Sequence, residues 1–154
     1  GWRMAIDIDL LKKVITEIKQ DLGEGFIATD IWSSTDNKSL IFNYAGSHMY
    51  TWGMTPLPAL SRTKQAPKSP GPFSGQPKTI DLLNEVTRKL DRTLVTAGFP
   101  GLGRYYLINL ENNLLALVLC AGPLQQYLLV DPSRTTMGIV MSVVLPKLME
   151  LLRR

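Results

Sequence analysis

The stretch "RYYLINLENNLLALVLCAGPLQQYLLV", residues 104–130, contains three short apolar runs separated by turn signals. Residues 104–110 lead through "ENN" into residues 114–122, and Gly122-Pro123 separates that run from residues 124–130. Connections this short cannot make the crossovers that parallel strands require. The stretch therefore predicts an antiparallel meander of three strands.

An amphipathic helix is predicted just before the meander, over residues 76–98. Its apolar stripe consists of Leu83, Val86, Leu90 and Leu94 at helical spacing. The segment "GFPGLG" (98–103) then leads from this helix into a strand. A phosphate cradle requires the opposite order, strand before helix, so that the positive end of the helix dipole faces the anion. The glycine-rich segment is therefore predicted to be a connector, with Gly98 ending the helix.

The remaining elements complete the pattern. Residues 7–25 predict a helix with Asp7 or Asp9 as its cap, and residues 25–46 predict a hairpin around "STDNKS". Residues 135–154 predict a last helix that Pro146 should kink or split. The order is helix, two strands, helix, three strands, helix, which indicates an α+β fold with a five-stranded antiparallel sheet packed by helices.

A long connection interrupts this pattern at about 45–77, inside a single domain of residues 1–154. It holds six of the ten prolines and no periodic run. It also contains "GSHM" (Gly46–Met49), which occurs in expression vectors as well as in natural sequences. A loop this long is usually functional or mobile. Arg62, Lys64 and Lys68 are its candidate partner contacts.

Charge and hydropathy exclude several classes of protein. The net charge of +4 comes from the acid-free segment between Asn37 and Ile80, and the cations there lack the aromatic platforms of single-strand binders. The longest apolar run, residues 137–152, is too short for a membrane span. No signal peptide is visible, and the single Cys120 suits a reducing compartment. We therefore expect a cytoplasmic protein that binds no nucleic acid.

The sequence offers little catalytic chemistry. The only histidine, His48, lies in the long connection, and Cys120 lies in an apolar strand. Asp131 precedes Pro132 and is predicted to be a turn residue. Asp30 is an acid among apolar neighbours and is predicted to face solvent. We expect no catalytic residue, no metal and no cofactor.

With this order of elements, the chain resembles the roadblock/dynein-light-chain family, which has a profilin-like or longin-like fold. The resemblance rests on the first helix, on "FIATDIWSSTDNKSL", on "QPKTIDLLNEVTRKLDRTL", on the meander, and on "DPSRTTMGIVMSVVLPKLMELL". It is stronger to bacterial members than to motor light chains. The long connection departs from the family, where the second strand is usually followed by a short link.

The resemblance implies a non-enzymatic protein. Family members are dimeric platforms that bind small Ras-like GTPases or serve as scaffold subunits, and they commonly join through the second helix and the neighbouring edge strand. Carried over, the dimer interface comprises Leu83, Val86, Thr87, Leu90, Asp91, Leu94, Tyr105 and Leu107. Two alternatives stay open: a sensor that binds a small ligand between helix and sheet, and an uncharacterised hydrolase.

Overall fold

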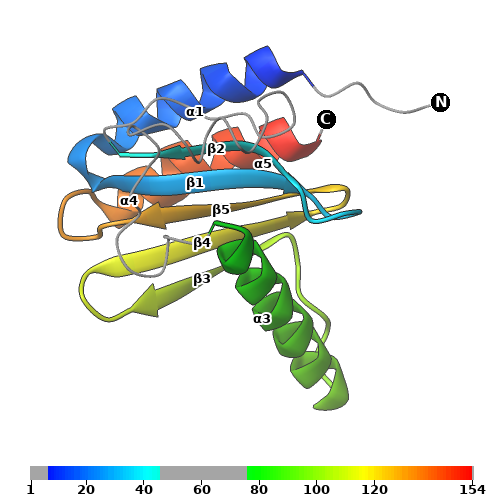
Figure 1. The fold of residues 1–154 in the computed structure, drawn as a ribbon. Coiled ribbons are helices and arrows are strands. Elements are labelled where there is room, and N and C mark those ends of the chain that lie inside the picture. The colour runs from blue at the N-terminus through cyan, green and yellow to red at the C-terminus, as the bar shows by residue number, and fades with distance from the viewer. Residues whose placement is uncertain (1–6, 46–75, 154) are drawn as a thin grey trace.

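The computed structural model describes residues 7–45 and 76–153. Its centre is a five-stranded antiparallel sheet in the order β2-β1-β5-β4-β3 (Figure 1). The strands are β1 (Phe26–Ser33), β2 (Ser39–Tyr44), β3 (Tyr105–Leu110), β4 (Leu114–Ala121) and β5 (Leu124–Val130). The predicted fold class, the hairpin around "STDNKS" and the meander are confirmed.

One face of the sheet is covered by the first and last helices. Helix α1 (Ile8–Leu22) buries Leu11, Ile15, Ile18 and Leu22, which are the core side of its apolar stripe. The last helix contributes Val140, Val144, Leu145, Leu148, Leu151 and Leu152 to the same core. Each such side chain contributes about 1.5–3 kcal/mol when fully buried. This core holds the sheet together from one side.

The last helix runs through Pro146 without a break. It consists of α4 (Met137–Ile139), a wider π-helical segment η3 (Val140–Val144), and α5 (Leu145–Arg153). The Leu145 N–H donates to the carbonyl of Val140, five residues back. The widened turn relieves the clash between a proline ring and the preceding helical turn. The sequence predicted a kink or a split at Pro146; the helix is not split, and a π segment precedes the proline instead.

The helix-capping residues lie where the sequence predicted them. The Asp7 side chain accepts from the Leu10 N–H at the start of α1. At the end of α3 (Gln76–Thr96), Gly98 has a φ of 87°. The Gly98 N–H donates to Val95 and the Phe99 N–H to Leu94, which is the hydrogen-bond pattern of a Schellman motif. The predicted role of Gly98 as a helix-ending connector residue is confirmed.

The second face of the sheet carries α3. Ala28, Trp32, Phe42, Ile80, Leu83, Tyr106, Ala116, Val118, Tyr127 and Leu129 form its core. Helix α3 begins over the sheet and runs across the strands and past β3 (Figure 1). The long connection of about 45–77, with Gly46–Met49, His48, Arg62, Lys64 and Lys68, lies outside the described residues except at its ends. Within the described ranges, no helix is both long and apolar enough to cross a membrane.

Gly25 gives a test of the packing at one corner of the sheet. A Cβ on Gly25 would lie 2.7 Å from the Thr135 Cβ, whereas a Cβ on Gly103 would meet nothing within 4 Å. We expect Gly25→Ala to lower the free energy of unfolding by about 1–3 kcal/mol through overpacking. Gly103→Ala should change it by less than about 0.5 kcal/mol. Urea denaturation of both variants measures the difference, and equal unfolding midpoints would contradict the close packing of Gly25 against Thr135.

Candidate interaction surface

Strand β3 forms one edge of the sheet. The Cys120 N–H donates to the Arg104 carbonyl at 2.8 Å, and the ladder pairs Tyr106 with Val118. Because backbone groups alternate in direction along an antiparallel strand, Tyr105, Leu107 and Asn109 direct their N–H and C=O groups away from β4. Such an edge offers a ready template for pairing with another strand.

The two faces of β3 differ in their surroundings. Tyr106 and Ile108 pack with the core under α3, whereas Leu107 packs against the core under α1 and α5. Leu110 ends the strand on the α3 face, opposite Leu114, and 46% of its surface is exposed. The α3 face of the edge strand is therefore buried at its start and open at its end.

Helix α3 is fixed to the sheet through its first half. Ile80 and Leu83 are buried in the core. The hydroxyl of Tyr106 and Thr87 Oγ1 are hydrogen-bonded at 2.8 Å, and Asn84 donates to Asn37 at 2.9 Å. These contacts place the middle of α3 over the start of β3.

The second half of α3 extends beyond β3, as Figure 1 shows. We call residues 90–99 the arm. Leu90 and Leu94 are only partly buried, and Val95 and Phe99 are 55% and 63% exposed. Part of the apolar surface of α3 thus continues past the edge strand, although Leu90 still packs against the core.

The loop that leads from α3 to β3, residues 97–104, is hydrogen-bonded to this arm. The Asp91 carboxylate accepts from the Leu102 N–H at 2.8 Å. A Cβ on Gly101 would lie 2.7 Å from the same carboxylate, so this position has no room for a side chain unless Asp91 moves. The loop is therefore held along one side of α3, the side that carries Asp91.

The predicted interface residues fall into two groups. Leu83, Thr87 and Asp91 make the contacts described above within their own chain. Val86, Leu90, Leu94, Tyr105 and Leu107 keep exposed surface, although Val86 and Leu90 also pack against the core under α3 and Leu107 against the core under α1 and α5. The stripe alone could not separate these groups, because a helix that covers its own sheet and a helix that covers a neighbour have the same periodicity. Leu110 was missed because a strand's last residue shows no pattern of its own.

The expectation that Asp30 faces solvent is wrong. Asp30 is fully buried, on the α3 face of β1 between Phe42 of β2 and Tyr127 of β5. Its carboxylate accepts a 2.6 Å hydrogen bond from Ser39. Strand β1 lies between two other strands and is covered on both faces. The alternation of apolar and polar residues that indicates a solvent-exposed face therefore does not apply to it.

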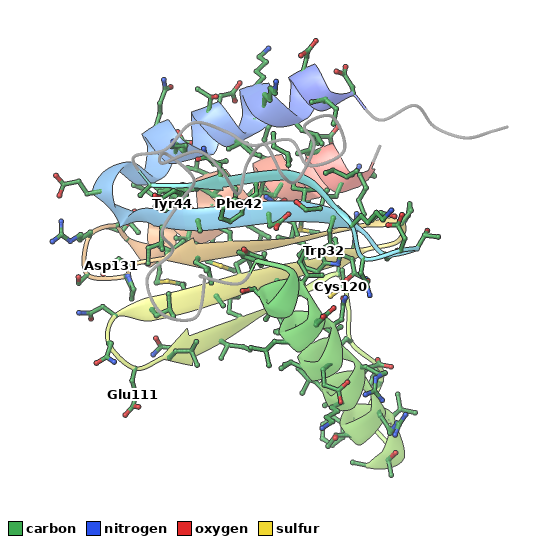
Figure 2. All side chains as sticks on the ribbon, viewed as in Figure 1. Trp32, Phe42, Tyr44, Glu111, Cys120 and Asp131 are labelled. Carbon is green, nitrogen blue, oxygen red and sulfur yellow. The ribbon has the colours of Figure 1, made fainter. Side chains whose placement is uncertain are left out.

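Two further polar groups are buried near Asp30. The rings of Trp32 and Tyr127 lie 5.9 Å apart, and Trp32 is labelled beside α3 in Figure 2. Neither Trp32 Nε1 nor the Tyr127 hydroxyl has a hydrogen-bond partner among the described residues. Burial, and secondly the charge of Asp30, hold the pKa of Tyr127 well above its usual value. Tyr127 therefore stays protonated, and this group is part of the interior.

The other candidate chemical groups have structural environments. Asp131 accepts from the Ser133 N–H and hydroxyl, which lower the pKa of the Asp131 carboxyl and confirm it as a turn residue. Burial raises the pKa of the Cys120 thiol, so Cys120 is a poor nucleophile. Within residues 7–45 and 76–153, no cluster of His, Cys, Asp and Glu could hold a metal ion.

A hollow of about 330 Å³ opens at the corner of the sheet where β1 begins. Phe26, Ile27 and Tyr44 contribute apolar walls. Tyr44 stacks on Phe42 with ring centroids 6.3 Å apart, and both are labelled in Figure 2. Arg134 bridges to Glu24 at the rim. The hollow has the size of a small ligand site, but Arg134, the one cation among the described residues that line it, is already paired.

The arrangement defines an α+β fold of the roadblock type. Among solved structures, MglB in a tetrameric arrangement matches with a TM-score of 0.58 and 12% identity, over 92% of this chain and 87% of that chain. Identity this low supports the fold alone. No protein-family model and no curated protein matches the sequence. The resemblance to the roadblock family is thus supported at the level of the fold.

Replacing Asp30 tests its structural role. We expect Asp30→Ala to lower the free energy of unfolding by about 1–3 kcal/mol, because the Ser39 hydroxyl loses a charged acceptor in a buried site. Asp81→Ala, an exposed acid on α3, is the matched control and should change stability by less than about 0.5 kcal/mol. Thermal unfolding compares the two, and equal losses would contradict a specific role for Asp30.

Removing the Asp91 carboxylate tests the stiffness of the arm. In Asp91→Ala, the Leu102 N–H loses its acceptor, so its amide hydrogen should exchange with solvent about tenfold faster or more. Hydrogen exchange of residues 97–104 is the measurement. The amide of Leu10, bonded to Asp7 at the other helix, should exchange at an unchanged rate.

Proposed function

We propose that this chain is a non-enzymatic regulator or scaffold that acts as a cytoplasmic homodimer and binds a small Ras-like GTPase. The observation that carries the proposal is the roadblock-type fold with an open strand edge beside an overhanging helix. The family that the sequence resembles uses this pair of elements to build dimers. The partner and the localisation come from that resemblance.

The described surface supports self-association through α3 and β3. The outward backbone groups of Tyr105, Leu107 and Asn109 are already arranged to extend the sheet, which costs little ordering. The partly exposed Leu90 and Leu94 adjoin that edge and gain from being covered. Together they favour a partner that brings both a strand and an apolar surface.

The remaining proposed contacts concern the GTPase. Arg62, Lys64 and Lys68 stay proposed partner contacts, because cations on a connecting loop suit an acidic surface and speed its association. No described carboxylate or thiol on the interaction surface is placed for bond-making chemistry. A regulator of this kind acts by holding the switch regions of a GTPase in one conformation, so its affinity depends on the bound nucleotide.

One observation favours a second candidate, a small-ligand sensor. The hollow lined by Phe26, Ile27 and Tyr44 is large enough for a compact ligand. Among the described residues at its rim, Arg134 is already paired with Glu24. The sensor therefore ranks below the interaction module.

The test is nucleotide-dependent binding. Ras-like GTPases that co-purify from the native host are loaded with GDP or with a non-hydrolysable GTP analogue and titrated by calorimetry. We expect about a tenfold difference in affinity or more between the two states, the size of a typical coupling between sites. Equal affinity for both states, or no binding to either, would contradict the proposed function.

Light scattering at micromolar concentration should give twice the 17.2 kDa mass of one chain.

A further inference from the structure

We propose that the hollow at the start of β1 binds a compact organic ammonium ion, with its apolar body against Ala28 and Tyr44 and its ammonium group at Asp131. The inference deepens the second candidate function above, because it names the class of ligand, and it is independent of the homodimer. It is carried by the shape of the hollow and by the charges of the described residues that line it.

The hollow lies where the start of β1 meets the ends of β2 and β5. The Ala45 N–H, just after β2, donates to the Ile27 carbonyl at 2.8 Å. The Asp131 N–H, just after β5, donates to the Gly25 carbonyl at 2.8 Å. Figure 2 labels Tyr44 and Asp131 at this same end of the sheet. The lining residues are therefore held in place by backbone hydrogen bonds on both sides of β1.

A β-bulge changes the direction of β1 at this corner. In the ladder between β1 and β5, Phe26 and Ala28 pair with consecutive residues, so Ile27 is the extra residue of a bulge. A bulge bends its strand and redirects a side chain, and bulges are common beside functional sites. Ile27 is only partly buried and contributes a wall of the hollow. The bulge therefore helps to shape this site.

Ala28 leaves room for the body of a ligand. It lies opposite Tyr44 in the ladder between β1 and β2, and both side chains pack with the core under α3. Because Ala28 has only a methyl group, it leaves space beside the larger Tyr44 side chain. The hollow of about 330 Å³ lies at the lower end of the range for small-molecule sites, which is roughly 300–1,000 Å³.

The charges around the hollow favour a cation. Among the described residues that line it, the charged groups are the carboxylates of Glu24 and Asp131 and the guanidinium of Arg134. Arg134 Nη1 lies 3.1 Å from Glu24, and Arg134 Nε lies 3.6 Å from Asp131. An anionic ligand would have to compete with both carboxylates for this guanidinium. A cationic ligand instead balances the one negative charge that remains.

Asp131 is fixed in position and ionised. Its Oδ1 accepts from the Ser133 hydroxyl at 2.6 Å and from the Ser133 N–H at 2.9 Å. These bonds lower the pKa of the Asp131 carboxyl, so it is ionised at neutral pH. Asp131 is two positions beyond Leu129, which pairs with Ala28, and two extended residues span about 7 Å. A ligand of that length reaches from the apolar wall to the carboxylate.

The aromatic rings at this corner suit an organic cation. Tyr44 stacks on Phe42, which holds its ring in place, and an apolar ligand body gains from covering the exposed part of Tyr44. One contact of an ammonium group with a ring already exists nearby, because Lys19 Nζ lies 5.4 Å from the centre of the Phe26 ring. Lys19 belongs to α1 and is not among the described residues that line the hollow.

Titration with phenethylamine tests the site, because this probe carries an ammonium group on a short apolar body. We expect the amide resonances of Ile27, Ala45 and Arg134 to shift in a saturable way, with a dissociation constant of about 1 mM or below. The matched anion 3-phenylpropionate has the same ring and spacer. It should bind about tenfold more weakly or less, because it meets the excess negative charge of the hollow.

Two variants test the assigned contacts. Asp131→Asn keeps an oxygen for the Ser133 bonds but removes the charge, so phenethylamine should bind about tenfold more weakly. Asp81→Asn removes the same charge from an exposed position on α3 and should leave the dissociation constant within about twofold. Ala45→Leu adds bulk at an exposed residue that lines the hollow and should also weaken binding. Circular dichroism checks that the variants fold.

The outcomes separate this inference from the proposed function. The absence of a saturable shift with phenethylamine, equal binding of 3-phenylpropionate, or unchanged binding by folded Asp131→Asn and Ala45→Leu overturns the ammonium site. None of these results concerns the GTPase or the dimer, which calorimetry and light scattering measure separately. A monomeric chain that binds phenethylamine as expected would contradict the homodimer and support the ammonium site.

Discussion

The structure depends on where α3 lies on the sheet: it begins over the strands and runs past the edge strand β3, so part of its apolar surface continues beyond that edge. Ile80 and Leu83 use the first part of the stripe to close the second core. Leu90 still packs against this core, whereas Val95 and Phe99, further along, are 55% and 63% exposed. Hydrophobic burial does not distinguish between strands of one chain and of another, so the exposed end of the helix suits the association that we propose.

Most of the fold was predictable because local signals agreed with one another. The short connections around "ENN" and Gly122-Pro123 require antiparallel strands, and capping residues such as Asp7 and Gly98 mark the helix ends. The order of the strands within the sheet needed coordinates, since the pairing of β1 with β5 joins residues about a hundred positions apart. Long-range pairing of this kind leaves no local pattern.

The interaction surface was predictable only in part. From the sequence we predicted β3 and the stripe of α3 as an interface, but the sequence did not show that Leu83, Thr87 and Asp91 are used inside the chain. It also did not indicate that Leu110 and Leu82 are exposed, because single apolar surface residues form no periodic pattern. Asp30 was placed wrongly for a different reason. In the sequence, a polar residue that is buried in a strand covered on both faces looks the same as a polar residue on a solvent-exposed face.

The π segment at Val140–Val144 has a consequence for the length of the last helix. A π turn holds one residue more than an α turn, so the chain carries an extra position before Pro146. The wide turn takes up this position without the further rotation of about 100° that an α-helix would add, and Leu148 and Leu152 meet the same core as Val140 and Val144. Rewinding Val140–Val144 as a regular α-helix with every residue retained would turn the C-terminal segment by about 100° and carry its apolar side chains out of the hydrophobic interior, whereas deletion of one residue from the segment would leave that segment facing inward.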